Sequence, residues 1–239
     1  KGITIVGAAV ESSKVYDGTT KATIANAGTL SDNYDAENLT IVTGSAAYDN
    51  KNVGTGKTVA FTGFALAGDA AANYKLTAQP EAVTADITVK EIKIVDTAVE
   101  ASKVYDGNTG AEVTAAGTLE GLIDGDKVDI VTGKAAYDDK NVGTGKTVTF
   151  YDFALSGDDA ANYVLSAQPA STTAGITRRE LTITDLAVKD KRYDGKNTAE
   201  IDGTPTLVGM VDGDVLELVN GVPTFDSVTV GKNIPVSFT

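Results

Sequence analysis

Two copies of an eight-residue run end in the letters of a phosphate-binding loop. The run NVGTGKTV stands at 52–59 and again at 141–148. A phosphate-binding loop needs G-x-x-x-x-G-K-[ST], with a buried strand before it and a helix after it. The first glycine of that pattern would fall on Lys51 and Lys140, and the residues that follow the run are β-branched and aromatic, which disfavours a helix. We therefore predict a glycine-rich hairpin with positive-φ positions, and not a nucleotide site.

Carboxylates two positions apart form a second candidate site. The pairs recur in register and comprise Asp35 with Glu37, Asp124 with Asp126, and Asp212 with Asp214. Such a pair could share a calcium ion, although calcium takes about six to eight oxygens and no EF-hand-like loop follows. The favoured interpretation is a solvated turn, and the alternative is calcium bound by Asp124, Asp126, Asp212 and Asp214. Glycoside chemistry is disfavoured because its two carboxylates must face each other across a cleft.

Lysines that precede a repeated tyrosine by two positions offer a third chemistry. They are Lys14, Lys103 and Lys191. In a chain without disulfides, a lysine could form an intramolecular amide with an asparagine, and Asn73 and Asn162 recur as partners. The favoured interpretation is a lysine whose stem covers apolar surface and an asparagine that caps a turn.

Cysteine and histidine are both absent from the 239 residues. This absence excludes thiol nucleophiles, Ser-His-Asp triads, imidazole bases and the usual zinc sites. We predict no catalytic residues and no cofactor apart from the calcium alternative. Extracellular existence would have to be sustained without disulfides.

The formal net charge of −13 bears on the choice of partner. A chain this acidic repels phosphate backbones, so nucleic acid is not expected as a partner. No apolar run approaches the ~20 residues of a membrane span. The first residues, KGITIVGAAV, are strand-like and do not resemble a signal peptide. We expect an interior piece of a longer protein or a mature product.

The candidate residues belong to a repeated unit. KVYDG stands at 14–18 and 103–107, and KRYDG stands at 191–195, so the tyrosines are 89 and then 88 residues apart. Aspartate before glycine suits a turn in which the carboxylate accepts nearby N–H groups, with the tyrosine packed on its own sheet. The period predicts three modules, which we call repeats one, two and three: residues 1–90, 91–178 and 179–239, the third being partial.

Each repeat shows the pattern of β-strands separated by Gly, Asn, Asp and Ser. About seven short strands in a unit of this length is typical of an immunoglobulin-like sandwich. In KTVAFTGFAL the apolar phase shifts across Gly63, which predicts a β-bulge. The predicted fold class is all-β, with tandem immunoglobulin-like β-sandwich modules.

The links between repeats contain neither glycine nor proline. ITVKEIKIV (87–95) and ITRRELTIT (176–184) predict that the last strand of one repeat runs almost directly into the first strand of the next. Such links restrict the angle between modules. We therefore expect an elongated, semi-rigid rod.

A local signature near the end of a repeat resembles the tyrosine corner of immunoglobulin domains. It occurs at 69–76 and 158–165, where Leu76 and Leu165 would occupy the place of the buried cysteine. Carbohydrate recognition usually requires exposed aromatic side chains. Two tyrosines outside the repeat pattern, Tyr34 and Tyr151, are the better candidates for such a surface contact.

Together, KVYDGTTKAT, KNVGTGKTV and GDxAANYxL resemble the YDG-type repeat of large bacterial surface and filamentous-haemagglutinin-like adhesins. The resemblance implies secreted all-β stalk or matrix modules without known catalysis. Repeat three departs from the pattern, since Arg192 replaces valine and FDSVTVGKNIPV (225–236) is a degenerate copy of YDNKNVGTGKTV (48–59). Its tyrosine corner would lie beyond Thr239.

The leading expectation for function is a non-catalytic stalk or matrix segment of an extracellular, cell-surface or secreted bacterial adhesin, acting as a spacer in adhesion or biofilm. Its partners would be the neighbouring repeats of the same chain. One alternative is a module that binds a host or matrix glycan or protein. Another is a homopolymer, in which strand addition from a second chain completes repeat three.

Overall fold

The computed structural model describes residues 1–31 and 38–239 and divides into two compact units. The first unit comprises Lys1–Ala98, Val113–Lys134 and Phe150–Ala170, and the second comprises Val99–Glu112, Ala135–Thr149 and Ser171–Thr239. The division therefore falls inside repeat two, and not at the link between repeats. The link from repeat one to repeat two lies within the first unit, and the link from repeat two to repeat three lies within the second.

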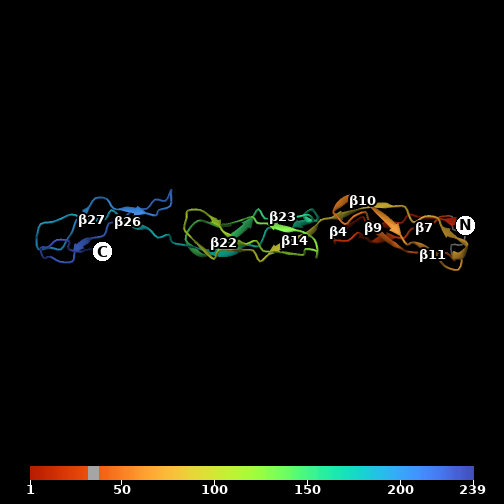
Figure 1. Cartoon of the computed structure of the whole chain (residues 1–239), viewed down its shortest axis with the longest axis horizontal. Coiled ribbons are helices and arrows are strands. Elements are labelled where there is room, and N and C mark those ends of the chain that lie inside the picture. The colour runs from red at the N-terminus through yellow and green to blue at the C-terminus, as the bar shows by residue number, and fades with distance from the viewer. Residues whose placement is uncertain (32–37) are drawn as a thin grey trace. The chain divides into compact units, whose positions relative to one another are not determined.

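The fold is all-β, as predicted; the described residues contain short strands and two single turns of 3-10 helix (Figure 1). Repeat one contains β1 (Gly2–Ile3), β2 (Ile5–Val6), β3 (Ala9–Val10), β4 (Ser13–Val15), β5 (Lys21–Ala22), β6 (Ile24–Asn26), β7 (Thr29–Leu30), β8 (Thr40–Val42), β9 (Ser45–Tyr48), β10 (Gly54–Thr62), β11 (Ala65–Ala67), η1 (Ala71–Asn73), β12 (Lys75–Leu76) and β13 (Val83–Thr88).

Repeat two follows with a closely matching order of elements. They are β14 (Lys90–Val95), β15 (Ala98–Val99), β16 (Ser102–Val104), β17 (Gly110–Ala111), β18 (Val113–Ala115), β19 (Thr118–Glu120), β20 (Asp129–Val131), β21 (Lys134–Tyr137), β22 (Gly143–Tyr151), β23 (Ala154–Ser156), η2 (Ala160–Asn162), β24 (Tyr163–Leu165) and β25 (Thr172–Thr177). Repeat three contains β26 (Thr182–Thr184), β27 (Ala187–Val188), β28 (Ile201–Asp202), β29 (Thr206–Val208), β30 (Pro223–Phe225) and β31 (Val236–Phe238).

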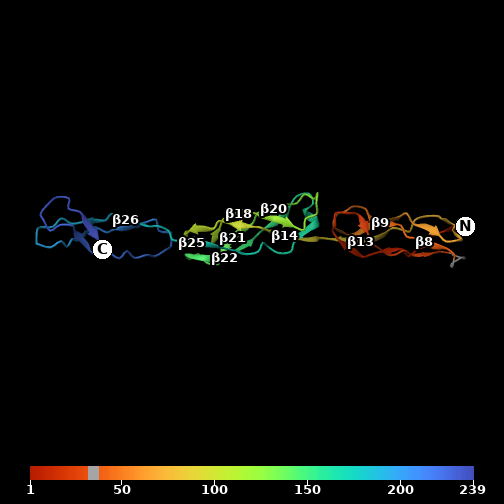
Figure 2. The same ribbon diagram turned by 90° about the horizontal axis from the view of Figure 1, so that it is seen from below.

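A five-stranded sheet is the largest sheet of repeat one. Its strand order is β4-β13-β10-β9-β5, with β13 parallel to β4 and the other pairs antiparallel (Figure 1 and, turned by 90°, Figure 2). Repeat two builds its own sheet in the equivalent order, β16-β25-β22-β21-β17. In both sheets the last strand of the repeat is inserted between the strand before the YDG run and the long strand. The YDG run is therefore held close to the end of its own repeat.

The core of the first unit is formed by alternating apolar side chains. In β13 the side chains of Ala85 and Ile87 are buried, and Val59 of the neighbouring β10 is fully buried. Each buried aliphatic side chain of this size contributes about 1.5–3 kcal/mol to stability. The same cluster also contains Ile92 and Tyr163 of repeat two, so the apolar core continues across the first link.

The sequence predicted a β-bulge at Gly63, and this prediction was wrong. The long strand β10 ends at Thr62, Gly63 has a φ of 73°, and a separate strand begins at Ala65. This break turns both Phe61 and Phe64 inward, where their rings meet edge to face at 5.7 Å. The side chain of Gln79 accepts the N–H of Phe64 at 2.8 Å and donates to its carbonyl at 3.0 Å, replacing the lost strand pairing. Phe153 and Gln168 repeat the arrangement.

The run NVGTGKTV lies at the predicted hairpin, between the antiparallel strands β9 and β10, but its Gly-Thr-Gly-Lys part is inside β10 and not in the connecting loop. The connecting loop is 49–53, and the register shifts between Gly54 and Lys57. The predicted positive φ is confirmed at Gly56, where it is 60°. The Lys57 ammonium bonds to the side chains of Asp49 and Asn50 at 3.1 and 2.8 Å. Because the residues after Lys57 continue a strand, the helix of a phosphate-binding loop is missing here.

The two links differ in length. Between repeats one and two, β13 ends at Thr88 and β14 begins at Lys90, so the predicted direct passage from strand to strand is confirmed. Between repeats two and three, β25 ends at Thr177 and β26 begins at Thr182, which leaves four residues outside any strand.

Candidate inter-repeat docking site

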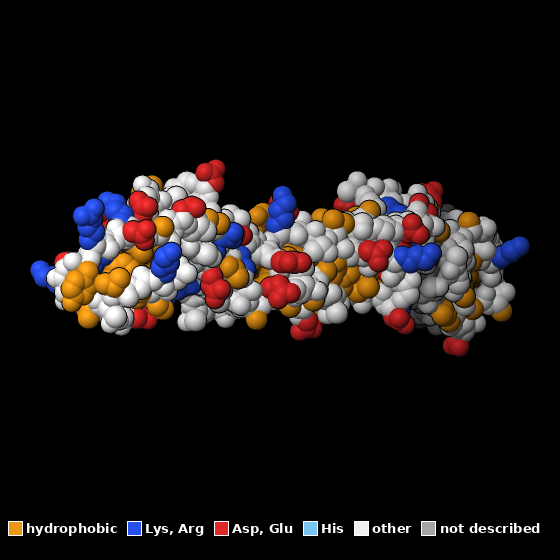
Figure 3. Space-filling model, turned by 60° about the vertical axis from the view of Figure 1, so that its left-hand side comes forward, with side chains coloured by type: hydrophobic (Ala, Val, Ile, Leu, Met, Phe, Trp, Pro, Cys, Tyr) orange, Lys and Arg blue, Asp and Glu red, His pale blue; other side chains and the backbone are white. Residues whose placement is uncertain are grey.

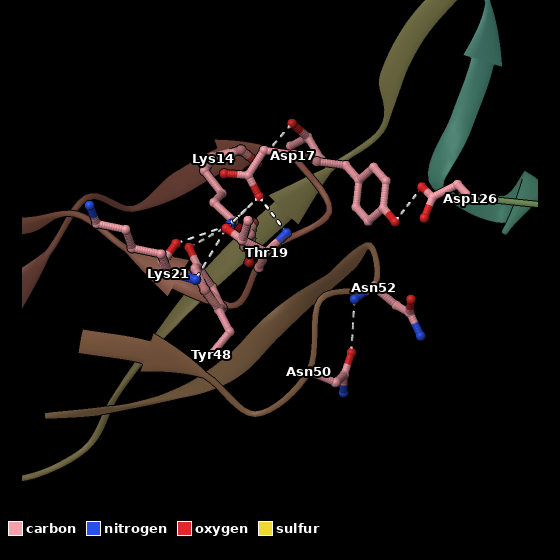
Figure 4. Close-up of polar contacts among 11 residues, drawn as sticks. Lys14, Asp17, Thr19, Lys21, Tyr48, Asn50, Asn52 and Asp126 are labelled. Carbon is pink, nitrogen blue, oxygen red and sulfur yellow. Dashed lines mark hydrogen bonds and ion pairs between the residues drawn. The ribbon is translucent and has the colours of Figure 1, made fainter. Parts of the chain in front are cut away.

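The tyrosine of the first YDG run bonds to a carboxylate of repeat two. The hydroxyls of Tyr16 and Tyr163 each donate to Asp126 Oδ2 at 2.6 Å. The ammonium of Lys51 donates to the other oxygen, Asp126 Oδ1, at 2.7 Å. Figure 4 shows Asp126 reaching from repeat two toward the tyrosine hydroxyl of repeat one. We call these four residues the Asp126 cluster.

Most of the Asp126 cluster is out of contact with solvent. Tyr16 is 1% exposed and the side chain of Asp126 is 3% exposed, whereas Lys51 remains half-buried. The rings of Tyr16 and Tyr163 meet edge to face with centroids 5.4 Å apart. An unpaired carboxylate at such a place would be very costly, so the three donors are what permits a charge there.

The cluster changes the proton affinity of its members. Burial by itself would raise the pKa of Asp126, but the hydrogen bonds from Lys51, Tyr16 and Tyr163 outweigh it and hold the pKa below its usual value. Burial, together with the hydrogen bond to Asp126, raises the pKa of both tyrosines. The hydrogen bond to Asp126 raises the pKa of the Lys51 ammonium. At neutral pH the cluster therefore holds an ionised carboxylate, a charged lysine and two neutral phenols.

Local sequence explains why Asp126 points toward repeat one. The run I-D-G-D forms a tight turn in which the N–H of Asp126 bonds to the carbonyl of Ile123 at 3.2 Å, and Gly125 supplies a φ of 87°. The N–H of Ile123 donates to the Tyr163 hydroxyl at 3.2 Å. Tyr163 thus ties the turn to its own repeat and, through Asp126, to the preceding one. We call residues 123–126 and their counterpart 211–214 acidic turns.

The glycine of the YDG run leaves room for the acidic turn. A Cβ atom on Gly18 would lie 3.1 Å from Ile123 Cγ2, which is closer than side chains normally approach. Gly18 also has a φ of 76°, where glycine is favoured. The three letters of the motif therefore have separate roles: the tyrosine donates across the link, the aspartate closes the turn, and the glycine permits close approach.

The second unit repeats this arrangement at the next link. The Tyr105 hydroxyl donates to Asp214 Oδ1 at 3.0 Å, and the Lys140 ammonium lies 3.9 Å from the same oxygen. A Cβ atom on Gly107 would lie 2.6 Å from Val211 Cγ1. Asp214 is more exposed than Asp126, at 25%, and no second tyrosine bonds to it among the described residues. The second link is therefore the looser of the two.

The carboxylates considered for calcium take part in these contacts. Asp126 and Asp214 accept hydrogen bonds from tyrosines, while Asp124 and Asp212 lie in the same turns. Within residues 1–31 and 38–239, no group of three or more acidic side chains is arranged to hold a metal ion. Calcium binding stays a prediction. The first pair, Asp35 and Glu37, lies outside the described residues.

The turn predicted for the YDG aspartate is confirmed, and the tyrosine makes a further contact that was not predicted. Asp17 Oδ1 accepts the N–H of Thr19 at 2.9 Å and the Lys14 ammonium at 2.7 Å. Tyr16 belongs to the same buried cluster as Val59 and Ile87 of its own repeat, and its hydroxyl in addition bonds to repeat two. This contact was missed because its partner lies 110 residues away, in a turn that was interpreted as solvated or as a calcium ligand. Lys51 was missed as well, although its recurrence as Lys140 was a usable signal.

The lysines considered for amide crosslinks have other partners. Besides Asp17, the Lys14 ammonium donates to the carbonyls of Thr19 and Lys21 at 2.8 and 2.9 Å (Figure 4). The Lys103 ammonium binds Asp106 at 2.7 Å, and Lys191 binds Asp194 at 2.9 Å.

Asn162, proposed as a crosslink partner, instead takes part in the first link. Its Oδ1 accepts the N–H of Val53 at 2.9 Å. The nearby Tyr163 was expected to form an immunoglobulin-type tyrosine corner, in which the hydroxyl bonds to backbone a few residues upstream. Its hydroxyl instead accepts the N–H of Ile123, 40 residues upstream, so the corner predicted at Tyr163 is not formed.

Of the two tyrosines considered for glycan contact, one lies among the described residues, and glycan binding stays a prediction. Tyr151 is 39% exposed at the end of β22, and Tyr34 lies outside the described residues. A helix long and apolar enough to cross a membrane is not found among the described residues.

These features define a class of all-β repeats whose neighbours are joined through tyrosine–carboxylate contacts. The model of the YDG domain family matches the chain over residues 1–82, 88–173 and 177–239, and the chain belongs to that family. No curated protein and no solved structure was found to match the chain.

Proposed function

We propose that the chain is a non-catalytic structural segment of a secreted or cell-surface bacterial adhesin, of the filamentous-haemagglutinin-like kind. Its immunoglobulin-like modules would be arranged as a semi-rigid rod that spaces a binding region from the cell or builds matrix in a biofilm. The observation that supports this most directly is the Tyr16–Asp126 contact, because a buried polar contact between adjacent repeats resists bending at the link.

Two further observations are consistent with a spacer. The first link has a single residue, Val89, between β13 and β14, so it has no slack. The face seen in Figure 3 carries acidic and basic side chains scattered among one another. A mixed, strongly charged surface keeps an exposed module soluble without disulfides.

Small-angle X-ray scattering on the full chain tests the rod. We expect the distance distribution of a stiff, elongated particle, and a broader distribution for Asp126→Ala, which removes the acceptor at the first link. A compact particle, or identical curves for both proteins, would contradict the proposal.

Antibodies against the chain should label intact source cells. Specific, saturable binding on a glycan or matrix-protein array would instead support a receptor-binding module.

Strand addition between chains is a second candidate function, favoured by a groove in repeat three. In repeats one and two the last strand lies between the strand before YDG and the long strand. In repeat three, residues 190–191 and 231–234, which align with parts of those two strands, line a groove of about 620 Å³. Lys191, Phe225 and Ile234 line it. An extended segment with the pattern of β25 would fit this position.

The peptide STTAGITR, residues 171–178, is the probe for strand addition. We expect it to bind the full chain, whereas the same peptide with Ile176→Asp should not, because Ile176 is buried in repeat two. Equal binding of both peptides, or binding of neither, would remove this candidate.

A further inference from the structure

The YDG run of repeat three resembles the other two, but among the described residues no acidic turn contacts it. Tyr193 is 68% exposed, against 1% for Tyr16, and its hydroxyl has no hydrogen bond among the described residues. A Cβ atom on Gly195 would meet nothing within 4 Å, whereas Gly18 and Gly107 each face an aliphatic side chain of the following repeat.

The backbone of this run is nonetheless formed as in repeat one. Gly195 has a φ of 76°, the same as Gly18. The N–H of Lys196 bonds to Asp194 Oδ1 at 3.0 Å, as Thr19 does to Asp17. Because the turn has its shape without an occupant, binding would require little rearrangement.

We propose that the Tyr193–Gly195 run is a docking site for the acidic turn of another YDG module. The occupant is identified by what the two formed links share: an aliphatic β-branched residue that fits over the glycine and, three positions later, a carboxylate that accepts the tyrosine hydroxyl. Ile123 with Asp126 supplies this pair in one link, and Val211 with Asp214 in the other. The inference rests on the geometry of the links, and not on the proposed adhesin role.

The site also differs from the formed links in one charge. Val228 of repeat three aligns with Lys51 and Lys140, the lysines that approach the acceptor carboxylate. Docking at Tyr193 therefore relies on the hydrogen bond from the Tyr193 hydroxyl and on apolar contact. Val228, which is half exposed and lines the same groove as Tyr193, is available for that apolar contact. It should be weaker than the first link and less sensitive to salt.

Disulfide capture tests this proposal directly, since the chain has no cysteine of its own. The probe is a cyclic peptide of residues 119–129, LEGLIDGDKVD, in which cysteine replaces Ile123. It is mixed with the full-length variant Gly195→Cys under thiol exchange, and the mixed disulfide is measured by intact mass. The control is Gly213→Cys, also a positive-φ glycine with open space around the missing Cβ. Each cysteine is also reacted with a small neutral disulfide, and the peptide capture at each position is divided by this value to correct for differences in cysteine reactivity.

We expect the peptide to be captured at position 195 about tenfold more than at position 213, the factor that a hydrogen bond to a charged group provides. Adding Tyr193→Phe to the protein, or Asp126→Asn to the peptide, should reduce capture to the level of the control. Equal capture at both cysteines, or capture indifferent to both substitutions, would overturn the proposal. A failure of this test would leave the scattering test of the rod unaffected, because that test concerns the first link.

Discussion

The Tyr16 hydroxyl and the Asp126 carboxylate are 2.6 Å apart although 110 residues separate them in the chain. That separation exceeds the repeat period of 89 by 21 residues, and both Tyr16 and Tyr105 bond to the acidic turn of the following repeat. In repeat two, Asp126 contacts repeat one and Tyr105 contacts repeat three. The YDG motif of repeats one and two therefore joins neighbouring modules. This role explains why the motif recurs at a regular spacing in the chain.

Replacing Tyr16 by phenylalanine should weaken the first link specifically. The substitution removes one donor to a buried carboxylate, and hydrogen bonds to charged groups are worth about 1.5–3 kcal/mol. The matched control is Tyr48→Phe, whose hydroxyl donates to the carbonyl of Asp86 within repeat one at 3.1 Å. Hydrogen exchange at the Ile123 amide should accelerate in Tyr16→Phe and stay unchanged in Tyr48→Phe. Equal protection in both variants would mean that the Asp126 cluster does not hold the turn.

Alanine substitution of the three YDG glycines should give a graded series. All three have φ between 76° and 80°, so the backbone strain of about 1 kcal/mol is the same for each. They differ in the nearest atom to the new Cβ: Val211 Cγ1 at 2.6 Å for Gly107, Ile123 Cγ2 at 3.1 Å for Gly18, and nothing within 4 Å for Gly195. The loss of stability in urea should rank Gly107→Ala first, Gly18→Ala second and Gly195→Ala third. Three equal losses would show that only backbone strain matters.

The all-β class and the direct passage across the first link could be predicted from local pattern, because alternation in Val83–Thr88 and the lack of glycine in 87–95 are properties of neighbouring residues. The break at Gly63 could not. Two aromatic residues three apart indicate a phase shift. A full break in the strand also requires new hydrogen-bond partners for the backbone of Phe64, and the side chain of Gln79, 15 residues away, provides them.

The contact between Tyr16 and Asp126 could not be predicted from local sequence for a related reason. The YDG run and the DGD run each have a sufficient local explanation as a turn, and both are turns in the structure. What joins Tyr16 to Asp126 is a pairing between successive repeats, which a single copy of the motif does not encode. The signal lay in the recurrence itself, since a tyrosine, a glycine and an acidic turn recur together at the same period.

Chelation provides a test of the calcium alternative. Both oxygens of Asp126 already accept hydrogen bonds, from Lys51 and from two tyrosines, so a cation would have to displace a lysine. We expect the melting temperature to be the same in a chelator and in millimolar calcium chloride. An increase with calcium that disappears in Asp124→Asn, which leaves the Asp126 cluster intact, would show instead that the acidic turns bind the ion.

The pH dependence of the first link should have two limits with different origins. Asp126 has a pKa below the usual carboxyl value of about 4, so its stabilising effect is complete above that value and is lost as the pH falls through the lower pKa of the folded protein. Tyr16 and Tyr163 have pKa values above the usual phenol value of about 10. Their effect is complete below about pH 10 and is lost as the pH rises through the raised values.

Protection of the Ile123 amide, measured across this range, should therefore be flat at intermediate pH and fall at both ends. Other carboxylates, such as Asp17 and Asp106, also have lowered pKa values, so the whole chain loses stability in acid and a control is needed. Asp126→Asn should abolish the loss of Ile123 protection that comes from protonating the carboxylate of the link. Asp17→Asn should leave that loss unchanged. If wild type and Asp126→Asn lost protection at the same acid pH, the carboxylate would not be the group that responds, and the link would be held by apolar contact alone.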